Sequence, residues 1–272
     1  MQSALTVHDF NLIATLDSGQ VFGFEKQAWG VYQGRIGRRL AKLSQDSNCL
    51  YIETVRRGPV SEEIQRYFDL ERDLLFVKDV LREEGLDACL KPIWGLRLIQ
   101  QDAWEALACF IISSNNNIKR IQKIWWNLSQ RLSESGSLFP APVEIARSHE
   151  RILRELGLGY RAPYLLRAAQ FVAVNPESLR VIRDSDYDEA RKRLLRFPGI
   201  GAKVADCALL YGFQKYEAFP VDTWILRTMR KYYFRNRNVS EERIHAFARK
   251  RWGNYAGYIQ QYLFHGARVG LI

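Results

Sequence analysis

Lys203 and Asp222 are the residues whose types and positions in this chain could do chemistry together. Lys203 directly follows the run Pro198-Gly199-Ile200-Gly201-Ala202, in which the proline and glycines end one helix and permit a tight hairpin before the next. We expect that next helix over residues 202–213. Its first amide groups have no partner inside the helix and should face the hairpin, where they would attract a phosphate.

The position of Lys203 is unfavourable for an ordinary structural lysine, because helix N-termini disfavour cations. The same positive field should disfavour the ammonium form, and a neutral amine is a nucleophile. Asp222 is expected to cap a helix over residues 223–234, where an anion is favoured and stays ionised. Each residue taken singly is more simply a solvated lysine or an ordinary N-cap. Together, beside a glycine hairpin, they indicate a nucleophile and a persistent carboxylate.

The charge of the chain is strongly uneven. Its 272 residues carry a net charge of +10, and 47% of them are hydrophobic, which is enough for real cores. Residues 151–272 hold 22 Lys and Arg against 11 Asp and Glu, whereas residues 1–150 hold 18 against 19. A basic half is typical of a nucleic-acid-binding protein. The alternative is a generic basic surface that aids solubility.

The cysteines and histidines exclude several classes of site. Neither type has the spacing of a zinc site, and no cysteine cluster near the C-terminus suggests an iron–sulfur centre. The sequence has no signal peptide and no apolar run long enough to span a bilayer. We therefore expect reduced thiols in an intracellular protein that needs no metal. The cysteines are Cys49, Cys89, Cys109 and Cys207, and the histidines are His8, His149, His245 and His265.

The first part of the chain mixes strand and helix patterns. Turn-forming residues separate segments rich in strand-forming residues, and two helical patterns follow before a junction at residues 85–92. We expect an antiparallel sheet with helices packed on one face. The expected strands are 20–24, 29–33, 35–43 and 49–54, and the expected helices are 60–68 and 73–84.

From Asp102 onward the pattern is helical throughout, and short loops between the helices suit a compact bundle. Asp102 and Glu105 form a capping box for the first of these helices. The sequence therefore predicts an α+β protein, with an N-terminal antiparallel sheet domain over 1–95. A helical catalytic region over 96–272 would hold the helix-hairpin-helix at about 187–213 and the active-site cleft. The expected helices are 103–113, 118–132, 143–156, 162–174, 187–196, 202–213, 223–234, 241–252 and 255–267.

Two polar breaks interrupt the helical pattern. The run Ser113-Ser114-Asn115-Asn116-Asn117 is rich in hydrogen-bonding groups and is followed by Lys119 and Arg120. The run Gly157-Leu158-Gly159-Tyr160-Arg161 carries an aromatic ring and a guanidinium, which suit stacking and base contacts. The alternatives are a plain turn and a glycine-terminated helix end.

Two pairs of residues share helix faces through their i,i+4 spacing. Cys207 lies one turn after Lys203, and Gln260 lies one turn before Phe264. A glutamine beside a phenylalanine offers a base both a hydrogen-bonding edge and a stacking surface. From spacing alone, a small buried cysteine, a core phenylalanine and a solvated glutamine are the simpler interpretations.

These segments together resemble the helix-hairpin-helix superfamily of DNA glycosylases, and within it the 8-oxoguanine DNA glycosylase/AP lyase family. The resemblance spans almost the whole chain, and six motifs in this order are very specific. Two positions depart from the vertebrate-type enzymes: Trp224 replaces a smaller polar phosphate-contacting residue, and Tyr211 replaces a pocket methionine. The motifs are residues 17–22, 113–118, 157–162, 198–207, 220–222 and 252–264.

The resemblance implies a role for each matching residue in catalysis and base recognition. Lys203 would attack the sugar C1′ and form a Schiff base, and Asp222 would stabilise the positive charge that develops at the sugar. Gly19 would present its carbonyl to the N7–H that 8-oxoguanine has and guanine lacks. Cys207 and Phe264 would sandwich the flipped base, and Gln260 would read its Watson–Crick edge.

The resemblance also implies how DNA is held. Asn115 would fill the gap left by the extruded base, Tyr160 would wedge the duplex, and Arg120 and Arg161 would bind the orphaned cytosine. The hairpin amides, with Gly199, Gly201 and Val204, would hold a phosphate independently of sequence.

The expected reaction is excision of 8-oxoguanine paired with cytosine, followed by β-elimination, without a cofactor or catalytic metal. We expect a monomer that acts on double-stranded DNA and not on membranes, in the cytoplasm or nucleoid of a prokaryote or the nucleus of a eukaryote. The alternatives are a glycosylase for an alkylated purine and a non-catalytic DNA-binding module. The superfamily further implies a monovalent cation held by the carbonyls of Leu195, Phe197 and Ile200.

Overall fold

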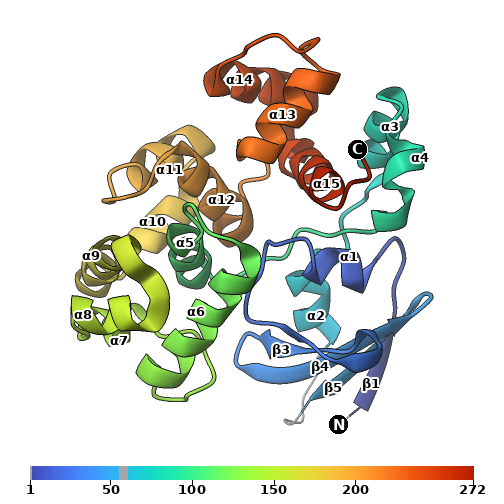
Figure 1. Ribbon diagram of the computed structural model, residues 1–272. Helices are drawn as coiled ribbons and strands as arrows, with labels where there is room; N and C mark the ends of the chain where they lie inside the picture. Colours follow the sequence, from blue (N-terminus) through green and yellow to red (C-terminus); the bar gives the residue numbers. More distant parts are fainter. Residues whose placement is uncertain (1, 55–60) are drawn as a thin grey trace. The chain divides into compact units, whose positions relative to one another are not determined.

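The computed structural model describes residues 2–54 and 61–272, which form two compact units (Figure 1). The sheet unit comprises Met1–Gln100 together with Lys215–Ile272, and the hairpin unit comprises Gln101–Gln214. No helix in the described part of the chain is both long and apolar enough to cross a membrane. The division at residues 95 and 96 that the sequence indicates remains a prediction.

A five-stranded antiparallel sheet in the order β1-β5-β4-β3-β2 forms one end of the sheet unit. Leu43 pairs with Ile52 and Tyr32 pairs with Leu43, so the buried side chains of three strands share one face. The predicted α+β class is confirmed. The strands are β1 (Gln2–Thr6), β2 (Glu25–Lys26), β3 (Tyr32–Ile36), β4 (Arg39–Asp46) and β5 (Cys49–Thr54).

One face of this sheet is covered by helices α1 (Leu12–Leu16) and α2 (Ser61–Tyr67). Ile64 of α2 and Phe68 just after it are fully buried in the same core as Leu43 and Leu50 of the strands. Burial of alternate strand residues is what a half-covered antiparallel sheet requires. The expected sheet with helices on one face is therefore what the protein forms, although the first residue of the expected helix 60–68 lies outside the described residues.

The structure corrects several of the expected strands. The expected strands 29–33 and 35–43 are instead β3 and β4, because the turn between them lies at residues 37 and 38 and not at Gly34, and β2 was not expected. Residues 20–24 are not a strand, because Gln20, Val21, Phe22 and Phe24 are buried together in an irregular segment rather than on alternate positions. The strand β1 escaped prediction, because it is an edge strand whose residues are all partly or fully exposed and so lack apolar alternation.

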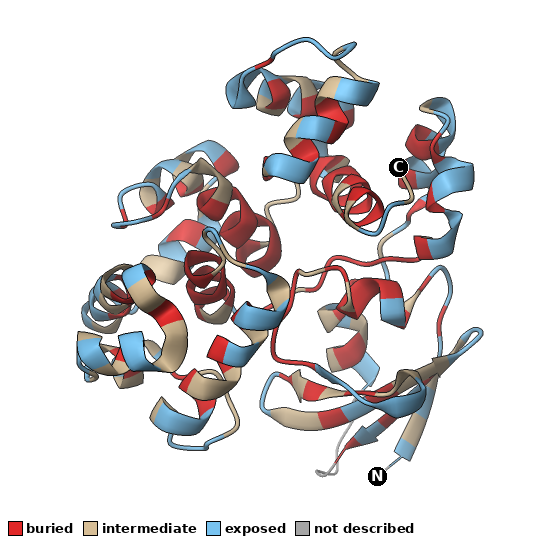
Figure 2. Cartoon of the chain, in the orientation of Figure 1, coloured by how far each residue is buried: buried red, intermediate tan, exposed pale blue. Residues whose placement is uncertain are grey.

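The sheet unit also contains most of the C-terminal helices. The longest, α15, is buried along most of its length (Figure 2), and a Cβ on Gly266 would lie 2.3 Å from Leu90 Cδ2, so a larger residue there would require the Leu90 side chain to move. The expected junction at 85–92 contains a short helix, α4. The helices are α3 (Leu75–Glu83), α4 (Asp87–Leu90), α13 (Thr223–Tyr232), α14 (Glu241–Trp252) and α15 (Ala256–Arg268), with 3-10 turns η1 (Ala28–Gly30), η2 (Lys91–Ile93) and η5 (Gly253–Tyr255).

The hairpin unit is entirely helical. Asp102 caps α5 by accepting from the amides of Trp104 and Glu105, as predicted, but the Glu105 carboxylate accepts from Trp125 Nε1 at 2.8 Å instead of closing a capping box. Burial raises the pKa of Glu105 to about 7. The helices are α5 (Ala103–Ile112), α6 (Ile118–Leu132), α7 (Pro142–Ala146), α8 (Glu150–Leu153), α9 (Ala162–Val174), α10 (Ser178–Asp184), α11 (Tyr187–Leu194) and α12 (Ala202–Phe213), with turns η3 (Arg154–Leu158) and η4 (Gly159–Arg161).

Helices α5 and α12 form the centre of this unit, and both are buried on nearly every side (Figure 2). They approach closely because position 212 is a glycine: a Cβ on Gly212 would lie 2.8 Å from the Cβ of Ala106. The single helix expected over 143–156 is instead two short helices, because His149 caps a new start by accepting from the amide of Arg151 at 3.2 Å.

Asp206 joins α11 to α12 from inside the hairpin unit. Its side chain has no exposed surface and accepts from the Tyr187 hydroxyl at 2.7 Å and from Arg191 Nε at 2.9 Å. A buried ion pair of this kind is costly to break, because each partner left alone keeps its desolvation penalty. Asp206 therefore fixes the two helices that flank residues 195–201.

Asp206→Ala is expected to lower the free energy of unfolding by about 3–5 kcal/mol, because Arg191 and Tyr187 lose a buried acceptor. Arg193→Gln is the matched control on α11. This variant removes the ion pair with Glu189, in which the side chains of Arg193 and Glu189 are 40% and 39% exposed. The loss should therefore cost less than about 1 kcal/mol of unfolding free energy. Urea unfolding of both variants measures the difference, and equal small losses would contradict a structural role for Asp206.

Candidate functional site

The hairpin between α11 and α12 uses its two glycines differently. Gly199 has a φ of +80°, and a Cβ there would lie 2.3 Å from Cγ of Tyr164 on α9, so packing inside the unit demands glycine. Gly201 has an ordinary φ of −91°, and a Cβ there would meet nothing within 4 Å. Gly201 is also the N-cap of α12 and offers no side chain to its amides. The start of α12 is therefore open to an outside acceptor.

Lys203 lies in the first turn of α12, as the sequence predicted. Its Nζ donates to the hydroxyl of Ser113 at 3.0 Å and lies 5.5 Å from the centre of the Phe110 ring. The Ser113 hydroxyl in turn donates to the carbonyl of Phe110 at 2.8 Å, so its direction is fixed. The ring of Phe110 is itself stacked on Tyr211 at 5.1 Å between centroids. A partly buried amine is thus held between a hydroxyl and an aromatic face.

Cys207 and Val204 share α12 with Lys203, and each is only 5% exposed. Burial of Cys207 agrees with its simpler interpretation as a small buried hydrophobe. Cys207 lies on the same face of α12 as Lys203, because the two residues are one helical turn apart. The expected base contact of Cys207 remains a prediction.

The three consecutive asparagines have three different local structures. Asn115 adopts a left-handed φ of +46°, Asn116 donates to the carbonyl of Ile112 at 3.1 Å, and Asn117 caps α6 by accepting from the amide of Arg120 at 3.0 Å. A left-handed conformation is uncommon for a residue other than glycine and is found at functional turns. Asn115 therefore stands out from its two neighbours.

The second polar break holds the asparagine loop in place. Arg161 is only 3% exposed, and its guanidinium donates to the carbonyls of Ser114 at 2.6 Å, Asn115 at 2.7 Å and Leu158 at 3.4 Å. The hydroxyl of Tyr160 also donates to Ser114 O, at 3.2 Å. A cytosine contact by Arg161 would have to replace some of these bonds, and it remains a prediction.

The structure brings Arg120 to the same pair of loops. Arg120 is exposed and donates to the carbonyl of Gly157 at 3.3 Å. The ring of Tyr160 is 49% exposed, and Gly157 takes a φ of +103°, as a glycine that ends a helical segment does. Arg120, Tyr160, Arg161 and Asn115 thus form one cluster in the hairpin unit, although no spacing rule in the sequence links the two loops.

In the sheet unit, Asp222 is the N-cap that the sequence predicted. Its Oδ1 accepts from the amide of Ile225 at 2.8 Å, at the start of α13. Pro220, two residues earlier, accepts at its carbonyl from Nε2 of Gln260 at 3.0 Å. The segment that carries Asp222 is therefore tied to α15.

Gln260 is buried rather than solvated, so the simpler interpretation of its spacing was wrong. It is 3% exposed, and its Oε1 has no hydrogen-bond partner among the described residues. A buried acceptor without a donor costs free energy, which marks the position as functional or strained. Phe264, one turn later, is partly exposed, with the guanidinium of Arg268 at 6.0 Å from its ring.

Gly19 lies in a loop that buried side chains hold. Its φ is +83°. The side-chain Nε2 of Gln20 donates to the Ser18 hydroxyl at 2.9 Å and to the carbonyl of Arg97 at 2.8 Å, and its Oε1 accepts from the backbone amide of Ile99 at 2.7 Å. Gln20 therefore attaches the Gly19 loop to residues 97–99.

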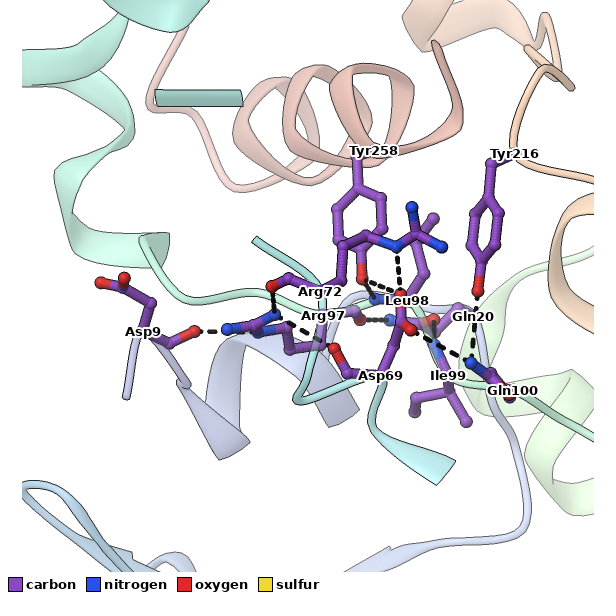
Figure 3. Close-up of polar contacts among 10 residues, drawn as sticks. All are labelled: Asp9, Gln20, Asp69, Arg72, Arg97, Leu98, Ile99, Gln100, Tyr216 and Tyr258. Atoms are coloured by element: carbon purple, nitrogen blue, oxygen red, sulfur yellow. Dashed lines mark hydrogen bonds and ion pairs between the residues drawn. The ribbon is translucent and has the colours of Figure 1, made fainter. Parts of the chain in front are cut away.

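A polar network that the sequence analysis missed supports residues 97–100 (Figure 3). Asp69 accepts from Arg72 Nε at 2.6 Å, from the Tyr258 hydroxyl at 2.7 Å and from Gln100 Nε2 at 3.1 Å. Burial, and then the nearby Asp69 carboxylate, raise the pKa of Tyr258 well above its usual value. No sequence signal marks Asp69, since an Asp and an Arg three residues apart resemble a solvated helix pair.

Helix α15 is thus the element on which these contacts converge in the sheet unit. Tyr258, Gln260 and Phe264 all lie on it, and the hydroxyl of Tyr258 also accepts from the amide of Leu98 at 3.3 Å. No group of three or more His, Cys, Asp or Glu side chains in the described ranges is placed to hold a metal ion. The sequence also suggested a cation bound by the hairpin carbonyls. The carbonyl oxygen of Phe197 accepts from the amide of Ile200 at 3.2 Å, which leaves its second lone pair available to coordinate a cation.

Comparisons with known proteins agree along the whole chain. Residues 3–107 match the family model of the 8-oxoguanine DNA glycosylase N-terminal domain, and residues 108–254 match the HhH-GPD superfamily base excision DNA repair protein model. A probable N-glycosylase/DNA lyase of Methanothermobacter thermautotrophicus is 32% identical, covering 98% of this chain and 97% of the relative. The N-glycosylase/DNA lyase of Saccharomyces cerevisiae is 30% identical over 82% of this chain and 72% of its own length.

Solved structures give the same result. The 8-oxoguanine glycosylase/lyase of Clostridium acetobutylicum, in complex with double-stranded DNA containing cytosine opposite 8-oxoguanine, matches with a TM-score of 0.87 and 31% identity over 99% of each chain. A 3-methyladenine DNA glycosylase from Archaeoglobus fulgidus, 21% identical with a TM-score of 0.78, shares the fold.

Alanine substitutions at the two hairpin glycines should show which glycine the fold itself requires. Gly199→Ala is expected to lower the melting temperature, because its φ and the ring of Tyr164 both oppose a Cβ. Gly201→Ala should leave it unchanged or raise it slightly, since alanine adopts that conformation freely. Thermal unfolding of both variants tests this, and a large loss in Gly201→Ala would show that the position is needed for folding.

Proposed function

This chain belongs to the HhH-GPD superfamily of base excision DNA repair proteins and is an N-glycosylase with DNA lyase activity of the 8-oxoguanine type, and from this premise we propose its reaction in detail. It flips 8-oxoguanine out of a pair with cytosine, excises the base through a Schiff base on Lys203 and cleaves the abasic strand by β-elimination. Flipping is required because the sugar C1′ and the base edges are inaccessible within a duplex.

The observation that carries this proposal is the environment of Lys203. Lys203 lies in the first turn of α12, where the helix dipole gives a structural lysine no stabilisation. The Ser113 hydroxyl and the face of Phe110 hold it in one place, so little freedom is lost when it attacks. Attack by the amine on C1′ breaks the glycosidic bond, and the base leaves with a proton. Opening of the sugar ring at the C1′–O4′ bond then gives a Schiff base, through which the abasic strand can be broken.

Asp222 supplies the negative charge in this proposal. Its N-cap bond to the amide of Ile225 and the dipole of α13 favour the ionised carboxylate. Positive charge builds up on the sugar as the base departs, and a fixed carboxylate stabilises that charge more in the transition state than in the ground state.

Base recognition is assigned to Gly19, Gln260, Cys207 and Phe264. The carbonyl of Gly19 would accept from the N7–H of 8-oxoguanine, whereas guanine would present another acceptor there and leave the carbonyl unpaired, at about 1–3 kcal/mol. The unpartnered Oε1 of Gln260 would accept from the Watson–Crick edge of the base. Cys207 and Phe264 would contact its two faces.

DNA binding is assigned to the hairpin and to the cluster of the two polar loops. The open start of α12, with Gly199, Gly201 and Val204, would bind a phosphate, so Gly201→Ala should lose DNA affinity without losing stability. Asn115 would fill the gap, Tyr160 would wedge the duplex, and Arg120 and Arg161 would face the cytosine. The carbonyls of residues 195, 197 and 200 would hold a monovalent cation that tightens this hairpin. We further propose that the protein is a monomer and acts in the nucleoid of a prokaryote or the nucleus of a eukaryote.

The proposal is tested by trapping the covalent intermediate. Wild-type protein incubated with an 8-oxoguanine:cytosine duplex and borohydride should become linked to DNA, because reduction fixes the Schiff base. Lys203→Gln should abolish the link and keep binding, whereas the exposed control Lys192→Gln on α11 should cross-link normally. Cross-linking by Lys203→Gln would overturn the assignment, and no excision by the wild type would overturn the proposed function.

Asp222→Asn should affect chemistry rather than binding. Asparagine keeps the shape and the capping oxygen but removes the charge. Single-turnover excision should therefore fall at least about tenfold, equivalent to about 1.4 kcal/mol of transition-state stabilisation, while lesion affinity and melting temperature stay the same. A large loss of helicity would instead indicate that Asp222 serves only as a cap.

Arg120→Ala should relax the choice of opposite base. A guanidinium has only donors, which suit the O2 and N3 acceptors of cytosine but not the N6 donor of adenine. Loss of this contact should cost roughly 1–3 kcal/mol of discrimination, measured as the ratio of excision rates opposite cytosine and adenine. Lys119→Ala, one position earlier, should change only salt-dependent affinity. Equal slowing opposite all four bases would make Arg120 a phosphate contact.

A further inference from the structure

The two peptide carbonyls that precede Gly19 are bound by side chains of α15. Gln261 Nε2 donates to the carbonyl of Ser18 at 3.3 Å, and an Nη of Arg268 donates to the carbonyl of Asp17. The helix that bears Gln260 and Phe264 therefore also holds the Gly19 loop. Both contacts lie within the sheet unit.

These two donors are built into the interior. Gln261 has no exposed surface, and Arg268 is oriented by His265, whose Nδ1 lies 2.9 Å from the same Nη. His265 is only 4% exposed, and burial, and then the Arg268 charge, lower its pKa to about 4. A neutral His265 accepts from Arg268 at neutral pH and so keeps the guanidinium aimed at Asp17.

Further hydrogen bonds hold this loop. Ser18 donates to the carbonyl of Thr15 at 2.8 Å, and Gln20 is anchored to residues 97–99 (Figure 3). Between these anchors lies the Gly19 carbonyl, which is proposed to read the base. Glycine has the least restricted backbone of all residues, so its own φ and ψ preferences cannot fix the direction of that carbonyl. The direction must come from the bonds to its neighbours.

We propose that Gln261 and Arg268 are positioning residues that aim the Gly19 carbonyl and thereby set the discrimination between 8-oxoguanine and guanine. The inference rests on the proposed function, since it assumes that Gly19 reads N7. It places specificity in two side chains that do not touch the base. Without them the peptides at 17 and 18 can rotate, and a rotated Gly19 peptide would accept the lesion less well and reject guanine less strongly.

The test measures discrimination directly. Gln261→Met and Arg268→Met remove the donors at nearly constant volume, and each is made in a Lys203→Gln background so that DNA is bound without being cut. Dissociation constants are measured for duplexes bearing 8-oxoguanine or guanine opposite cytosine. Each variant should reduce the preference for 8-oxoguanine roughly 3- to 10-fold, the equivalent of one hydrogen bond. Arg268→Lys keeps a donor and should recover part of the preference, and the exposed Lys250→Met on α14 is the control.

A second measurement separates positioning from a general structural role. For this measurement Gln261→Met and Arg268→Met are made in protein that keeps Lys203. Cleavage of a preformed abasic site does not require recognition of a base, so both variants should cleave it at the wild-type rate. A parallel loss of abasic-site cleavage and of discrimination would overturn the proposal, as would an unchanged preference for 8-oxoguanine. Absence of any preference in the Lys203→Gln parent would instead contradict the proposed function.

Discussion

The buried carboxylate of Asp69 is the constraint on which the sheet unit depends. It accepts from Arg72, Gln100 and Tyr258, groups that come from three separate stretches of the chain. In a region that excludes water, such a network is strong when every member is satisfied and costly when one is missing. Tyr258 lies two residues before Gln260 on α15, so the bond that anchors this helix also holds the backbone from which the side chain proposed to read the base extends.

The hairpin unit also depends on a buried aspartate, Asp206, which here joins two helices. Its central helices α5 and α12 are buried on nearly all sides, and the Asp206 ion pair joins α12 to α11. Lys203 therefore stands on an element that cannot shift without disturbing a close-packed interior. Such rigid placement suits the role proposed for this amine, since a nucleophile must be held close to the single carbon that it attacks.

Local signals in the sequence predicted the parts of the fold and site that depend on short-range chemistry. The glycine hairpin, the cap at Asp222 and the strand at 49–54 each follow from turn chemistry, capping or apolar alternation within a few residues. The strand β1 and the irregular segment 20–24 did not, because their conformations are set by pairing with β5 and by the buried bonds of Gln20. The Asp69 network joins residues up to 189 positions apart, which no local pattern reveals.

The unpartnered Oε1 of Gln260 links the stability of the unbound protein to its affinity for a ligand that donates a hydrogen bond there. A buried acceptor that lacks a donor costs about 1–3 kcal/mol in general, and Oε1 of Gln260 has no partner among the described residues. A ligand that supplies the donor removes that penalty, so part of its affinity comes from relieving the protein rather than from a new attraction. By linkage, the folded state gains stability as such a ligand binds. Under the proposed function, recognition of the base at this position would therefore also stabilise the fold.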